Sequence, residues 1–71
     1  MITATITNIV LEKDRFRVFV RFSNDVEETS IFMPDSTAED IKAWVNDRKI
    51  YHEEMLSKEQ ELQNSLIGLE I

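Results

Sequence analysis

The first half of the chain alternates between apolar and polar residues, which is the period-two pattern of half-exposed β-strands. In RFRVFVRF (15–22) one side of the expected strand carries Phe16, Val18, Val20 and Phe22, and the other carries Arg15, Arg17, Phe19 and Arg21. The flanking segments, 2–11 and 27–33, are rich in the Ile, Val, Thr and Phe that favour strands. Short polar turns at 13–14 and 24–25 separate them, so the pattern predicts a three-stranded antiparallel β-meander.

Two-residue turns would fix the strand register. Phe22 would then face Glu27, and Arg21 would face Glu28 across the second turn. The sheet face away from the core would hold these apolar and charged residues: Val10, Ile6, Arg17, Phe19, Arg21, Glu28 and Phe32. A bulge near Asn8 would instead rotate Ile2, Ala4 and Ile6 onto the core face, and the sequence leaves both alternatives open.

The second half of the chain has the features of a single long helix. Pro34 ends the third strand, and a capping box follows, either Ser36 with Glu39 or Thr37 with Asp40. Neither Pro nor Gly occurs again before Gly68, the natural end of the helix. We therefore predict an α+β fold in one domain, with a three-stranded antiparallel β-meander (1–34) packed on one long C-terminal α-helix with a short tail (35–71).

This helix is too long for the sheet that it covers. About 30 residues at 1.5 Å each span about 45 Å, whereas strands of eight residues span about 26 Å. The expected sheet contacts lie in the first part of the helix: Ile41, Trp44, Val45, Arg48, Tyr51 and, less centrally, Ile50. Beyond the sheet, Met55, Leu62 and Leu66 keep the four-and-three spacing of a coiled-coil seam. This pattern predicts a homo-oligomer that associates through the helix.

Two other interpretations of the helix remain open. The overhang could be the frayed end of a single amphipathic helix without a partner. Alternatively, the helix could break between Leu56 and Ser57, because SKEQ (57–60) is itself a capping box and could start a second short helix that folds back.

The residue types exclude most catalytic and cofactor sites. The chain has no Cys, one Gly and one His, so disulfides, thiolate metal sites and glycine-rich nucleotide loops are absent. His52 lacks a suitably spaced nucleophile, since Ser57 lies five residues further along the helix. Neighbouring acidic pairs such as Glu53-Glu54 point to different sides of a helix and indicate solvated charge. We expect neither an enzyme nor a bound cofactor or metal.

The charge indicates which partners are excluded and which are favoured. The net charge is −6, which disfavours binding to nucleic acid. No apolar run is long enough for a membrane span, and the start of the chain lacks the pattern of a secretory signal. We expect a cytoplasmic or virion protein.

One face of the expected sheet has the composition of a protein interface, in which aromatic and Arg side chains are enriched. The residues of this face are Arg17, Arg21, Phe19 and Phe32.

The chain resembles a loose class of small tailed-bacteriophage proteins in which a β-meander precedes a long helix. The matching pieces are VFVRFSNDVEETSIFMPDSTAEDIKAWV and SLIGLEI, although Asn24-Asp25 stands where that class has a turn glycine. The resemblance implies a virion or prophage accessory component. An assembly subunit is therefore our first hypothesis. The alternative is a small acidic inhibitor of a host nucleic-acid-binding or defence protein, which would present Asp47, Glu53, Glu54, Glu59 and Glu61.

Overall fold

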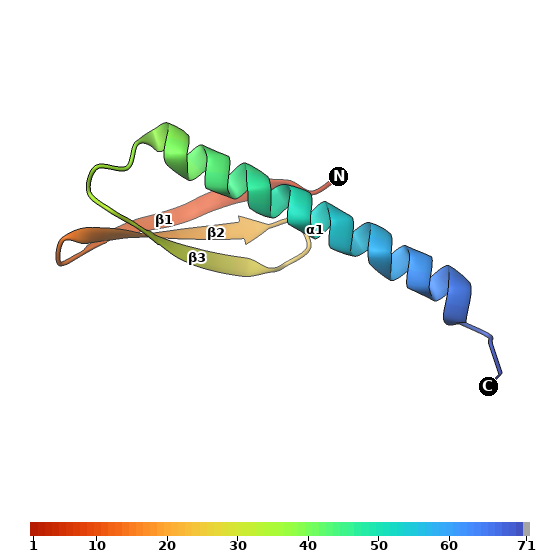
Figure 1. Ribbon diagram of the computed structural model, residues 1–71. Helices are drawn as coiled ribbons and strands as arrows, with labels where there is room; N and C mark the ends of the chain where they lie inside the picture. The colour runs from red at the N-terminus through yellow and green to blue at the C-terminus, as the bar shows by residue number, and fades with distance from the viewer. Residues whose placement is uncertain (71) are drawn as a thin grey trace.

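A computed structural model describes residues 1–70 as a three-stranded sheet and one helix (Figure 1). The elements are β1 (Ala4–Glu12), β2 (Arg15–Phe22), β3 (Glu27–Phe32) and α1 (Ala38–Leu66). The strands are antiparallel in the order β1-β2-β3, and α1 lies along one face of the sheet. The predicted α+β fold, with a β-meander followed by one long helix, is confirmed.

The first hairpin has the predicted register and also contains the bulge. Glu12 faces Arg15 across a two-residue turn, in which Lys13 adopts a positive φ of 57°. The register shifts between Ile6 and Asn8, where Thr7 is the extra residue. The bulge turns the start of β1 over, so Ile6 lies opposite Val20 on the side of the sheet that faces α1.

The second hairpin differs from the prediction by one residue. The turn has three residues rather than two: the N–H of Phe22 donates to the carbonyl of Val26 at 2.9 Å, and the N–H of Asp25 donates to the carbonyl of Phe22 at 3.0 Å. Asp25 has a φ of 65°, as three-residue hairpins require at the last turn position. Because side chains alternate along a strand, this shift exchanges the two faces of β3.

The core is small and lies between the sheet and the first half of α1. Its buried members are Ile2, Val18, Val20 and Phe22, and Ala4, Trp44 and Val45 pack against the cluster that Ile2, Val20 and Phe22 form. The predicted roles of Trp44 and Val45 are therefore confirmed. Tyr51 and Ile50 are 43% and 47% exposed, so neither is the buried sheet contact that was expected for Tyr51 and, less centrally, for Ile50. Their place on the sheet side is taken by His52, which is only 6% exposed.

Capping residues mark both ends of α1. The side chain of Thr37 accepts from the backbone N–H of Asp40, and the carboxylate of Asp40 accepts from the backbone N–H of Thr37. Of the two predicted capping boxes, this is the one that forms. At the other end Gly68 has a φ of 87°. The helix runs unbroken through Leu56 and Ser57, so the alternative with two helices is wrong.

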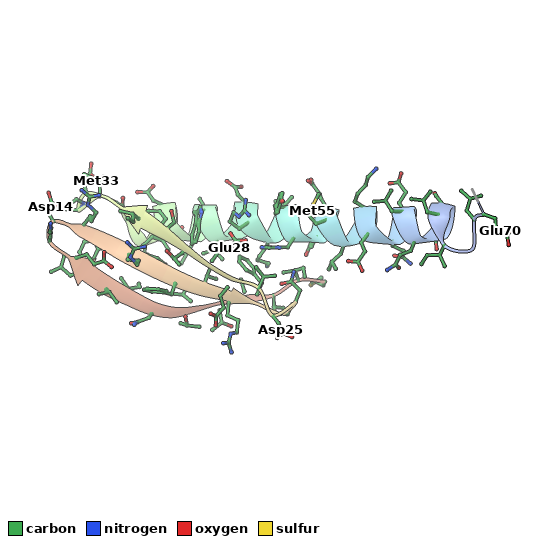
Figure 2. All side chains as sticks on the ribbon, turned by 90° about the horizontal axis from the view of Figure 1, so that it is seen from below. Asp14, Asp25, Glu28, Met33, Met55 and Glu70 are labelled. Carbon is green, nitrogen blue, oxygen red and sulfur yellow. The ribbon has the colours of Figure 1, made fainter. Side chains whose placement is uncertain are left out.

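The molecule is elongated because α1 projects beyond the sheet. Its extents are 55 × 19 × 17 Å, and its radius of gyration is 16.4 Å, whereas a compact domain of this length has about 11 Å. Figure 1 shows the C-terminal half of α1 leaving the sheet, and Figure 2 shows Met55 just past the β2–β3 turn that Asp25 marks. The predicted overhang is therefore present.

Candidate functional site

The projecting half of α1 carries an apolar stripe that the sheet does not cover. Met55, Leu62 and Leu66 are 45%, 44% and 53% exposed; we call these three residues the projecting stripe. A seven-residue interval places side chains on one side of a helix. This interval relates Ile41, Arg48, Met55 and Leu62. Ile41 and Arg48 are partly buried over the sheet. The stripe is thus the continuation of the side that packs on the sheet.

On the sheet face away from α1, the arginines form ion pairs with carboxylates of the same chain. Arg17 donates to Glu12 through Nε at 2.6 Å and through a second nitrogen at 3.2 Å, and Arg21 donates to Glu27. Phe19 lies between the two arginines in sequence and is partly buried. The positive charge of this face is therefore largely matched by cross-strand carboxylates, and Arg21 pairs with Glu27 rather than with the expected Glu28.

Phe32 is not on that face. The one-residue shift places it on the α1 side, where its ring lies edge-on to the ring of Trp44, with 5.7 Å between ring centroids and 74° between ring planes. It supports the core where α1 begins. Its assignment to an exposed interaction surface is therefore wrong, because that assignment depended on a two-residue turn.

A polar network links α1 to the second hairpin. Glu28 accepts from Nε of Arg48 at 2.6 Å, and its other carboxylate oxygen lies 2.5 Å from Nε2 of His52. Nδ1 of His52 lies 3.5 Å from the side-chain nitrogen of Asn24. Since an ionised carboxylate can only accept, Nε2 of His52 carries the hydrogen in this contact. Both ring nitrogens are thus occupied by protein partners.

The charges of the network stabilise each other. The hydrogen bond from Arg48 and, more weakly, the one from His52 hold the pKa of Glu28 below its usual value against the opposing effect of burial. Glu28 in turn raises the pKa of Arg48. The guanidinium of Arg48 also lies 4.3 Å from the centre of the Tyr51 ring, and His52 packs 4.4 Å from the ring of Phe22, measured between centroids.

This network was not predicted, although the sequence contained part of the signal. Positions 48 and 52 belong to the apolar four-and-three pattern, yet they hold Arg and His. Polar residues at such positions indicate buried partners of complementary charge. The partner could not be identified, because the expected register placed Glu28 on the opposite sheet face, beside Arg21.

Residues 1–70 show neither a metal-binding cluster nor a membrane-spanning helix. Among residues 1–70, no cluster of three His, Cys, Asp or Glu side chains is arranged to hold a metal ion. Within the same range, no helix combines the length and apolar character needed to cross a membrane. The chain matches no protein-family model, no curated protein and no solved structure.

Proposed function

We propose that this protein is a non-enzymatic subunit of a protein assembly and that it self-associates through the projecting half of α1. The proposal rests on the exposure of Met55, Leu62 and Leu66. In the N-terminal half of α1, the same side of the helix packs on the sheet. An isolated helix of about 14 residues is only marginally stable in water, so a partner surface would stabilise this half. The resemblance to small phage proteins supports a virion or prophage accessory role.

The open sheet face offers a second surface for a partner in such an assembly. Arg17 and Arg21 flank Phe19, and the neighbouring Val10 and Ile31 are 36% and 42% exposed. Aromatic and Arg side chains set among apolar groups are typical of protein interfaces. Because the arginines already have carboxylate partners, this face favours a protein over a phosphate backbone.

The experiment compares Leu62→Asp with Ser65→Asp by light scattering over a concentration series. Leu62→Asp places a charge in the stripe, and we expect it to shift the protein towards a monomer. Ser65 lies eleven residues after Glu54 and four residues after Glu61, and therefore on the same acidic side of the helix, which differs from the side of the stripe. Ser65→Asp adds the same charge as Leu62→Asp on that side and should leave the mass unchanged. Equal masses for both variants and the unmodified chain at every concentration would contradict the proposal.

The acidic side chains of α1 support the alternative, an inhibitor that competes with nucleic acid for a basic protein. Asp47, Glu54 and Glu61 are exposed and follow at seven-residue intervals along the helix, although Lys58 lies 3.6 Å from Glu61 and offsets part of their charge. This function predicts binding to a basic partner that weakens steeply with salt. An affinity that is constant from low to high salt would count against it.

A further inference from the structure

β1 carries apolar side chains that face the helix layer but are not covered by it. Ile6, Ile9 and Leu11 pair with Val20, Val18 and Phe16 and share their side of the sheet. They are nevertheless 40%, 50% and 64% exposed; we call these three residues the β1 strip. The ring contacts of α1 and the ion pair of Arg48 go instead to the β2–β3 hairpin, through Glu28, Phe22 and Phe32. On the β1 side, Glu53 accepts a hydrogen bond from the backbone N–H of Ile2, which precedes the strand. The helix layer above β1 therefore has room for a further element.

A groove runs beside α1 at the edge of this uncovered region. Its lining combines apolar groups of β1 and α1 with basic side chains of α1: Ala4, Ile6, Lys42, Val45, Asn46 and Lys49. Lys42 also contacts Glu39 at 3.2 Å. Lys49 has no ion-pair partner among the residues that the structure describes. An occupant of this groove should be apolar on one side and acidic beside it.

The projecting half of α1 has this composition. Residues 53–66 contain four acidic side chains and one basic one, in addition to the projecting stripe. Their charge is complementary to that of Lys42 and Lys49 at the groove. The segment presents Met55, Leu62 and Leu66 on the side that would face a sheet beneath it.

The projecting half of α1 is also as long as the sheet-covered half. α1 spans Ala38–Leu66, so 14 residues precede His52 and 14 follow it. Two copies of α1 placed antiparallel about a two-fold axis near His52 would set the projecting half of each beside the sheet-covered half of the other. Each segment of about 21 Å would then lie over the β1 strip of its partner. A two-fold arrangement of this kind is closed and uses the same surface of both copies.

We propose that the groove and the β1 strip receive the projecting half of α1 from a second copy of this chain, exchanged reciprocally in a two-fold dimer. This inference rests on the proposed self-association and adds the surface that the stripe contacts. It differs from a coiled coil between two projecting halves, in which the stripe would meet its own copy.

Single cysteines test this arrangement cleanly, because the chain has none of its own. A chain with Ile6→Cys is mixed with one that carries Leu62→Cys, and the mixture is oxidised gently. We expect a disulfide-linked dimer that contains both chains, since a disulfide requires the two Cα atoms to approach within about 7 Å. As a control, Thr29→Cys replaces Ile6→Cys; Thr29 pairs with Phe19 and shares its sheet face away from α1, so it should not link to Leu62→Cys.

The possible outcomes separate this inference from the proposed function. A dimer by light scattering together with the mixed Ile6–Leu62 cross-link supports both. An oligomer in which Leu62→Cys links to itself, or in which the mixed link does not form, overturns the inference and leaves self-association in place. A monomeric chain at every concentration overturns both. As a second variant, Lys42→Glu with Lys49→Glu should weaken dimer formation at least tenfold while the circular dichroism spectrum stays unchanged; undiminished association would also overturn the inference.

Discussion

Glu28 of β3 and His52 of α1 lie 24 residues apart in sequence and are joined by a 2.5 Å contact between Oε2 and Nε2. His52 is nearly buried, and the same carboxylate binds Arg48 one helical turn earlier. Glu28 therefore connects the sheet to α1 at the point where the helix leaves the sheet. The projecting half of α1 begins directly after this connection.

Glu28→Gln should destabilise the fold by about 1–3 kcal/mol, because it removes the charge that Arg48 and His52 share and leaves buried polar groups poorly satisfied. Glu27→Gln is the matched control, since Glu27 pairs with Arg21 at an exposed site where such pairs contribute less than about 1 kcal/mol. Urea unfolding followed by circular dichroism measures both. An equal loss for the two variants would show that the network does not hold α1 on the sheet.

The stability should fall in acid, with Glu28 as one source of the loss. Arg48 lowers the pKa of Glu28 in the folded state, so the unfolded chain takes up the proton first, near its ordinary value of about 4.3. The stabilisation is thus complete above that pH and is lost as the pH falls through the lowered folded-state pKa.

Urea unfolding between pH 7 and pH 3 measures this dependence. Glu28→Gln should flatten the curve below about pH 4.3. Glu27→Gln is the control, because its ion pair with Arg21 is exposed to solvent and should contribute little to stability. An unchanged acid slope in Glu28→Gln would contradict the assignment.

The register of β3 can be tested with two neighbouring residues. Phe32→Ala removes the contact with Trp44 and should cost about 2 kcal/mol, below the 3–5 kcal/mol typical of a fully buried Phe because Phe32 is only partly buried. Ile31→Ala, on the open face, should cost less than about 1 kcal/mol. Thermal or urea unfolding of both variants decides the register, because a two-residue turn would reverse their order.

The sequence was sufficient to predict the three strands and the helix, but not which residues of β3 lie on each face of the sheet. Period-two alternation, Pro34, the capping residues and Gly68 act locally, and the strands, the helix and its overhang follow from them. The error in β3 arose from one residue in the turn: Asn24 and Asp25 fit a two-residue turn and also a three-residue turn with Asp25 at positive φ. The choice depends on packing, since the three-residue turn brings Phe32 to Trp44 and Glu28 to Arg48.

The buried network could not be predicted for the same reason. A lone His in a helix has no preferred partner until the register of the neighbouring strand is known. Once Glu28 faces α1, the Arg and His at positions 48 and 52 have a common acceptor. Tyr51 is then left at the side of the helix, beneath Arg48, rather than in the core.

Sedimentation equilibrium of the unmodified protein over a wide concentration range measures the proposed self-association without any substitution. The chain mass is 8.3 kDa. We expect an average mass that rises with concentration and levels off at twice this value for the two-fold dimer. A mass that stays at 8.3 kDa at every concentration would contradict it.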